Sequence, residues 1–101
     1  NLSYVSEIAG DDCDFAEQFI DLFKEEFRWE VGMYLRYIKN REPRQASEMV
    51  AKSKYKLRIL GLERAFIFAE YYEQLLQQGD TSLDHEFRGI LKNVNSFLTK
   101  V

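Results

Sequence analysis

The sequence is poor in residues that cross-link or interrupt a fold: its 101 residues include one cysteine, one proline and five glycines. A single cysteine excludes an internal disulfide. The three aspartates around Cys13 disfavour a reactive thiolate, so we expect this residue to be structural. No apolar run approaches the roughly 20 residues that a membrane-spanning helix needs. No basic stretch followed by an apolar one opens the chain, as a secretory signal would.

The composition that is present indicates a globular domain. Hydrophobic residues make up 46% of the chain and charged residues 31%, a balance typical of folded soluble proteins. The formal net charge of −3 argues against a protein that binds duplex nucleic acid, because such proteins carry a basic excess. We expect residues 1–101 to form a single domain. Because the first residue is Asn1 rather than Met, we interpret the domain as part of, or excised from, a longer protein.

Apolar residues recur at steps of three and four through nearly the whole chain, which predicts helices. Pro43 suits the first turn of a helix, and Gly61 and Gly79 suit helix ends. The expected elements are a short helix over residues 2–9 and four long helices over residues 12–40, 43–61, 62–79 and 83–101. Short links between long helices favour antiparallel neighbours. The predicted fold is therefore all-α, an antiparallel up-down-up-down four-helix bundle with a short N-terminal helix.

The spacing also predicts which residues face the core. The first long helix carries two parallel apolar stripes, and the wider face that they make suits contact with more than one neighbouring helix. We expect the last helix to be capped by Asp80, Thr81 or Ser82. Its predicted inward line is the cleanest in the chain: Leu83, Phe87, Ile90, Val94, Phe97 and Val101. The two stripes of the first long helix are Ala16, Ile20, Phe23, Phe27, Val31, Tyr34 and Ile38, and Phe15, Phe19, Leu22, Trp29, Met33 and Tyr37.

The second long helix carries the most specific motif, in the stretch "MVAKSKYKLRILGLE" from Met49 to Glu63. Together with the Phe-rich opening of the chain, it resembles the histidine-containing phosphotransfer (HPt) domain, the helical carrier of two-component phosphorelays. That family has His, two residues, Lys, often Gly, and then Leu-Gly. Leu60 and Gly61 match the Leu-Gly pair, and Lys54 falls on the lysine. The resemblance covers essentially the whole chain and implies a bacterial-type cytoplasmic signalling module, free or within a membrane-anchored sensor.

The chain departs from the family at the residue that carries the chemistry. Ala51 stands where the acceptor histidine is expected, and a methyl group cannot take a phosphoryl group. Ser53 is predicted to face inward, Lys52 is protonated, and the only histidine, His85, belongs to the fourth long helix. Tyr55 replaces the usual glycine, which indicates a site that has diverged as a whole. No catalytic residue is therefore predicted at this position.

We interpret the outward face of the second long helix as a docking surface, because HPt domains, which the chain resembles, bind their partners through this face. The expected partner is a response-regulator receiver domain or a sensor histidine kinase. A receiver domain has an acidic pocket around its phospho-acceptor, which suits a basic face. An ordinary solvated helix face is the alternative. The predicted partner-binding residues are Ser47, Glu48, Ala51, Lys54, Tyr55 and Arg58.

Other functions stay open or find no support in the sequence. The chain could be a genuine phosphotransfer domain whose histidine has been replaced, or a structural bundle that forms a homodimer through Trp29 or Tyr37. We expect no enzyme activity and no cofactor, because there is no Gly-rich phosphate loop or triad material. Metal binding is not expected either. Di-metal bundles need Glu-x-x-His pairs, and the residue three before His85 is Ser82.

Overall fold

The computed structural model describes residues 13–101, which form four helices and no strand. The helices are α2 (Cys13–Lys39), α3 (Pro43–Ile59), α4 (Glu63–Gln77) and α5 (Asp84–Leu98). The prediction of an all-α fold is confirmed for this part of the chain. The predicted helix over residues 2–9 and the side chain of Cys13 lie outside the described residues. None of the described helices is both long and apolar enough to cross a membrane.

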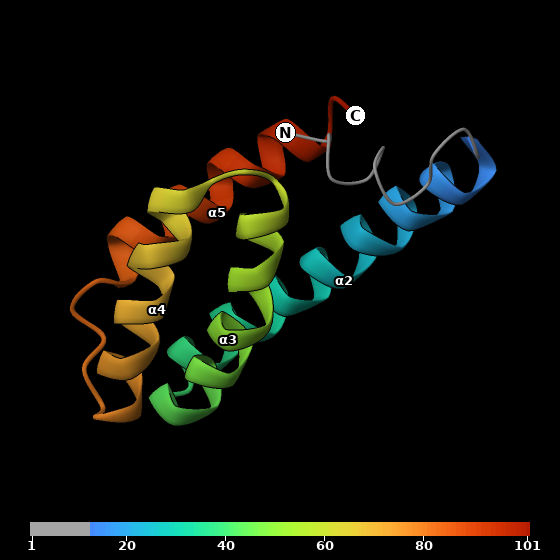
Figure 1. Ribbon diagram of the computed structural model, residues 1–101. Coiled ribbons are helices and arrows are strands. Elements are labelled where there is room, and N and C mark those ends of the chain that lie inside the picture. Colours follow the sequence, from blue (N-terminus) through green and yellow to red (C-terminus); the bar gives the residue numbers. More distant parts are fainter. Residues whose placement is uncertain (1–12) are drawn as a thin grey trace.

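Helix α3 occupies the middle of the arrangement. It contacts both α2 and α4, while α5 contacts α2. Figure 1 shows α3 and α4 side by side with opposite chain directions, and shows the first half of α2 extending beyond that pair. Because α3 has a neighbour on each side, only a narrow strip of its surface is left for solvent or for a partner.

The first three described helices end in the same kind of turn. Gly61 and Gly79 have positive φ angles of 79° and 84°, as their positions predict, and Arg41 adopts a similar angle of 59°. The amide after each of these residues donates to a carbonyl five positions back, as in the 2.9 Å bond from Leu62 to Leu57. This pattern satisfies carbonyls that the helix itself leaves unpaired. Short turns of this type let α3 and α4 pack directly against their predecessors.

The predicted cap of the last helix is wrong. Helix α5 begins after Leu83, and no side chain of residues 13–101 caps its first amides. The carboxylate of Asp80 instead accepts a hydrogen bond of 2.8 Å from the backbone amide of Ser82, within the preceding turn. An Asp favours both arrangements because its short side chain reaches an amide two residues ahead in either one.

The core follows the first predicted stripe of α2, whose residues are buried or half-buried. It does not follow the second stripe, of which Phe15, Leu22 and Trp29 are exposed, or the predicted line of α5. The buried residues of α5 are Phe87, Leu91, Val94 and Leu98. Phe97 and Val101, which the heptad placed inside, are about 40% exposed. The buried set shifts by one residue, and its member Phe87 packs against Tyr34 of α2 and Tyr72 of α4. Elsewhere the predicted inward line of α3 is confirmed, since these residues are all buried: Ala46, Met49, Val50, Ser53, Leu57 and Leu60.

One polar network lies inside the core where α2, α4 and α5 meet. The Tyr34 hydroxyl donates to Oδ1 of Asp84 at 2.5 Å and lies 2.6 Å from the Tyr72 hydroxyl. Since the proton of Tyr34 is directed at Asp84, Tyr72 is the donor to Tyr34. Nε of Arg88 donates to the other oxygen of Asp84 at 2.8 Å. Burial raises the pKa of Tyr34 well above its usual value and that of Tyr72 to about 12, so both hydroxyls keep their protons at neutral pH.

Candidate functional site

The residue at the phospho-acceptor position, Ala51, lies near the middle of α3 and is half-buried. It is therefore turned neither into the core nor fully toward solvent. Tyr55, one helical turn further on, is 55% exposed, and Glu48 and Arg58 are exposed on the same side. Residues three, four and seven positions apart share one face of a helix. The structure thus brings four of the six predicted docking residues onto one accessible strip of α3.

Ser47 does not belong to that strip, and its predicted outward position is wrong. Its exposed fraction is 4%, and its hydroxyl donates to the Arg44 carbonyl at 2.6 Å. The reason is that α3 packs against two neighbours, so a residue only about 80° away from Tyr55 around the helix is already covered. Ser53, as predicted, is buried, with its hydroxyl donating to the Val50 carbonyl.

Lys54 lies at the edge of the strip and is held by α4 rather than free for a partner. Its ammonium donates to Oε1 of Glu73 at 2.8 Å and lies 3.8 Å from the carboxylate of Glu70. The side chain is only 12% exposed. The hydrogen bond to Glu73 raises the pKa of Lys54 above its usual value, which keeps the charge on the amine. This lysine therefore fixes α3 to α4, and the carboxylate of Glu73 offsets its positive charge at the surface.

Lys56 performs the same role toward α2. Its ammonium donates to Oε2 of Glu30 at 2.9 Å and lies 3.8 Å from Glu26. Its side chain is 12% exposed, so Lys56 is no more available to a partner than Lys54 is. Glu30 is buried, and its second carboxylate oxygen has no hydrogen-bond partner among the residues that the structure describes. Burial raises the pKa of Glu30 despite the neighbouring lysine.

The raised pKa of Glu30 leads to a stability prediction. The folded state binds the Glu30 proton more tightly than the unfolded state does, so wild-type stability falls as pH rises from about 4.5 through the folded pKa. Glu30→Gln removes this ionisation. We compare the unfolding free energy of the variant with that of wild type. The difference, variant minus wild type, should increase over this range by about 1.4 kcal/mol for each unit by which the pKa is raised, and should be constant at higher pH.

Urea unfolding in half-unit steps between pH 4 and 8 measures this difference. Glu25→Gln is the control, because Glu25 is an exposed carboxylate on the same helix. Its difference from wild type is expected to stay below about 0.5 kcal/mol throughout. A Glu30→Gln difference that does not change with pH would contradict the assignment of a buried ionised carboxylate.

Several cations of α3 lie over aromatic rings. The ammonium of Lys52 is 5.4 Å from the centre of the Trp29 ring, and the guanidinium of Arg58 is 4.5 Å from that of Phe66. Cations this close to a ring face are attracted by it, by roughly 0.5–1 kcal/mol at exposed sites. The long side chains therefore lie along the surface of α3 rather than projecting into solvent. They leave an exposed strip that combines the ring of Tyr55 with the charged side chains of Glu48 and Arg58.

An apolar groove runs beside this strip, between α2 and α3, and we call it the α2–α3 groove. Its volume is about 220 Å³. Leu22 and Tyr55 stand on its two sides and are 56% and 55% exposed, and Trp29 is 53% exposed next to Lys52. The residues lining the groove are Phe19, Leu22, Phe23, Glu26, Lys52, Tyr55, Lys56 and Ile59.

Sequence reasoning missed the α2 side of this groove. The signal was present, because Phe15, Phe19, Leu22 and Trp29 form the second apolar stripe of the first long helix. That stripe was interpreted as contact with a further helix of the bundle. In the structure its members Leu22 and Trp29 are more than half exposed. A stripe wider than the core requires is the pattern that indicates an external contact.

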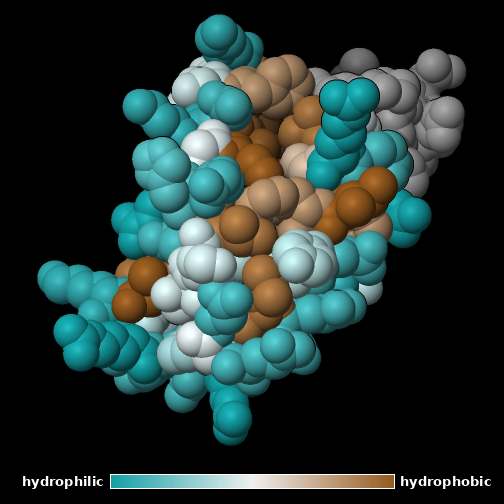
Figure 2. All heavy atoms as spheres, turned by 90° about the vertical axis from the view of Figure 1, so that its left-hand side faces the viewer, coloured by the Kyte–Doolittle hydropathy of each residue, from teal (hydrophilic) through white to brown (hydrophobic). Residues whose placement is uncertain are grey.

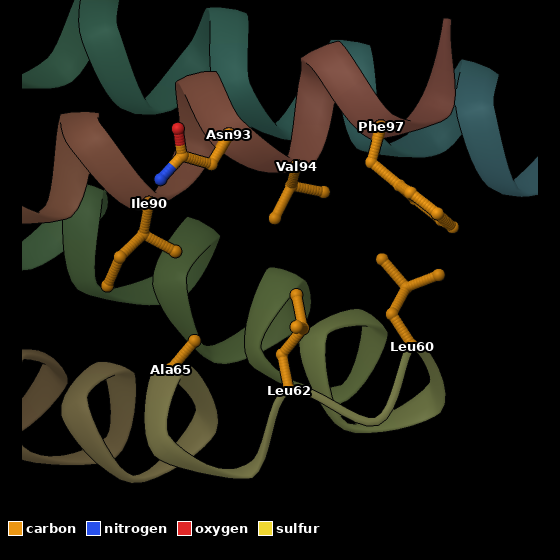
Figure 3. Close-up of a pocket in the computed structure, with 7 residues that line it drawn as sticks. All are labelled: Leu60, Leu62, Ala65, Ile90, Asn93, Val94 and Phe97. Atoms are coloured by element: carbon orange, nitrogen blue, oxygen red, sulfur yellow. The ribbon is translucent and has the colours of Figure 1, made fainter. Parts of the chain in front are cut away.

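A second apolar hollow, of about 320 Å³, lies between α5 and the corner that joins α3 to α4. In Figure 3 the side chains of Ile90, Val94 and Phe97 point toward Leu60, Leu62 and Ala65. Figure 2 shows apolar residues gathered in a band on the face that lies at the left of Figure 1. The hollow results from the shifted buried stripe of α5. Its lining includes one polar residue, Asn93, and no charged one, so it offers little for specific recognition.

Comparisons with protein-family models, with curated proteins and with solved structures found no match to this chain.

Proposed function

We propose that this chain is an HPt-like signalling module, an up-down-up-down helical bundle that binds a receiver domain or a sensor kinase without carrying phosphate. The observation that carries the proposal is the exposed apolar surface beside Ala51. Tyr55 lies one turn from Ala51, Leu22 of α2 lies across the adjoining groove, and Trp29 of α2 lies next to Lys52, which lines the groove; all three aromatic or aliphatic side chains are more than half exposed. Exposed large apolar side chains gathered around a groove are characteristic of protein–protein contact surfaces.

The electrostatics of the surface support an acidic partner. Lys52 and Arg58 are exposed, whereas Lys54 and Lys56 are neutralised by carboxylates of α4 and α2. Two exposed cations beside an apolar groove complement a partner that presents acidic residues around its own apolar patch. Charges of this kind mainly speed the encounter, while the apolar anchors supply most of the binding energy.

Loss of transfer follows from the chemistry of residue 51. Phosphoryl transfer from an aspartyl phosphate needs a nucleophile in line with the phosphorus. Ala51 has none, the hydroxyl of Ser53 is buried, and the ammonium of Lys54 is held protonated by Glu73. The module would therefore occupy the surface of its partner and compete with active carriers.

Binding is tested with the receiver domains of the source organism, each held in its active state by beryllofluoride. We expect at least one to bind wild type, and Tyr55→Ala combined with Leu22→Ala to weaken that binding at least tenfold, as measured by calorimetry. Tenfold corresponds to about 1.4 kcal/mol, a modest loss for two anchors.

Tyr71→Ala is the matched control for this experiment. Tyr71 is exposed to nearly the same degree, 58%, but lies on α4 about 200° around the helix from Glu73, which faces α3. It should leave binding unchanged. If no receiver and no kinase of the organism binds wild type, the proposal is wrong.

A further inference from the structure

A second groove lies on the opposite side of α2 from Leu22. Val31, nine positions after Leu22, is about 180° away around the helix and forms part of its floor. The groove consists of two adjoining hollows, of about 320 and about 240 Å³, which share Arg28 and Asn95. We call it the α2–α5 groove. Its lining residues are Lys24, Arg28, Val31, Leu35, Arg88, Leu91, Lys92, Asn95, Leu98 and Thr99.

The rim of this groove is basic although the protein as a whole is acidic. Lys24 and Arg28 come from α2 and Arg88 and Lys92 from α5, and among residues 13–101 no carboxylate side chain lines either hollow. This local excess stands out against a net charge of −3. Four cations that meet across one groove raise the local positive potential, which attracts negatively charged partners.

Within the described part of the chain, two of the four cations have hydrogen-bond partners and two have none. Arg88 donates to Asp84, and Lys24 donates to the carbonyl oxygen of Val101 at 2.6 Å. Within residues 13–101, Arg28 and Lys92 form no hydrogen bond or ion pair, and both are exposed. They lie on opposite walls of the larger hollow, above the apolar floor made by Val31, Leu35 and Leu91. A ligand that suits them must carry negative charge on both edges and apolar groups between.

We propose that the α2–α5 groove binds an acidic amphipathic helix of a partner protein. The shape favours a helix over a compact small molecule, because the two hollows follow each other along α2 from Lys24 to Leu35. At 1.5 Å per residue this stretch is about 16 Å long, the length of three helical turns. Apolar side chains at positions i, i+4 and i+7 of such a helix would enter the hollows, and flanking carboxylates would meet Arg28 and Lys92.

The test uses a fluorescein-labelled synthetic peptide of 14 residues with Leu at three positions spaced i, i+4 and i+7 and Glu on both flanks. We expect it to bind wild type in fluorescence anisotropy, and Arg28→Glu combined with Lys92→Glu to weaken binding at least tenfold in 50 mM salt. A peptide with Lys in place of Glu should prefer this variant. The effect of the substitutions should shrink in 500 mM salt, because exposed charges are then screened.

Controls separate this site from the rest of the surface. Lys39→Glu with Arg64→Glu reverses two exposed cations that line neither hollow, and should leave peptide binding unchanged. Leu22→Ala with Tyr55→Ala should also leave peptide binding unchanged, so a failure of the α2–α5 groove to bind the peptide can be distinguished from a failure of the proposed docking function.

Equal peptide binding by wild type and by the Arg28→Glu, Lys92→Glu variant would overturn the proposal. So would equal binding by a peptide with Ser in place of Leu. Sedimentation with phosphatidylserine vesicles that depends on Arg28 and Lys92, without peptide binding, would overturn it in favour of a membrane surface.

Discussion

Replacing Ala51 by histidine is expected to turn the protein into a phosphate acceptor. The half-buried position of Ala51 in α3 gives an imidazole access to solvent, and the exposed groove beside it allows a partner to approach. The phosphorus–oxygen bond of the receiver's aspartyl phosphate would break as a phosphorus–nitrogen bond forms, which regenerates the carboxylate. Imidazole suits this step because its pKa lies near neutrality. We expect label to pass from a ³²P-labelled receiver to Ala51→His and not to wild type.

The neighbouring tyrosine should limit the rate of this transfer. Tyr55 is 55% exposed one turn from residue 51, where a bulky ring restricts the approach of a partner. Ala51→His with Tyr55→Gly is therefore expected to accept label faster than Ala51→His alone, by about tenfold or more, a difference of about 1.4 kcal/mol in the barrier. The rate is followed by quenched-flow sampling and gel autoradiography.

Acid lability identifies the product, since phosphohistidine is lost in acid whereas phosphoserine is not. Ala51→Gln serves as the control, because glutamine is similar in size to histidine and is not a nucleophile. Failure of both histidine variants to accept label from a receiver that binds wild type would count against the relay-type arrangement of this surface.

The second large effect concerns the buried network of Tyr34, Tyr72 and Asp84. Tyr34→Phe removes one hydroxyl that both donates to Asp84 and accepts from Tyr72. The Tyr72 side chain has an exposed fraction of 0%, so its hydroxyl would be left without its partner and away from water. An unsatisfied buried donor and a lost bond to a charged group each cost about 1–3 kcal/mol. We expect a total loss of at least about 2 kcal/mol, which lowers Tm by roughly 8 °C or more in a domain of this size.

Thermal unfolding followed by circular dichroism measures this loss. Tyr71→Phe makes the same chemical change at an exposed side chain with no hydrogen bond in the described structure, and should shift Tm by less than about 2 °C. If the two variants unfold at the same temperature, the network does not stabilise the fold as described. The double variant Tyr34→Phe, Tyr72→Phe is expected to be more stable than Tyr34→Phe alone, because removing both hydroxyls leaves no orphaned donor.

The sequence was sufficient to predict the helices but not how each one rotates toward its neighbours. Helix ends follow local rules, so Pro43, Gly61 and Gly79 placed them to within a few residues. The prediction followed the regular heptad through Ile90 and Phe97, whereas the structure buries the adjacent line through Leu91 and Leu98, because the buried side of α5 depends on the helices it packs against. Val94 belongs to both lines. Phe97 and Leu98 are adjacent in the last turn, so only one of them faces the core, and in the structure it is Leu98.

At the candidate site too, some features follow from the sequence and others depend on how the helices pack. That Tyr55 and Arg58 are exposed follows from helical spacing alone. Ser47 and Lys54 could not be placed from the sequence, because their burial depends on α4 lying close against α3. Ion pairs between distant segments, such as Lys56 with Glu30, require the fold to be known first. The network around Tyr34 was missed for the same reason, since a tyrosine on an apolar stripe gives no sign of its hydroxyl partner.

The placement of Lys54 and Lys56 two positions apart on α3 has a mechanical consequence. One is tied to Glu73 of α4 and the other to Glu30 of α2, so any rolling of α3 about its own axis would stretch one of the two attachments. The strip between them is thus preorganised before a second protein arrives. A recognition element that is already rigid loses little entropy on association, which favours slow dissociation over adaptability to many different shapes.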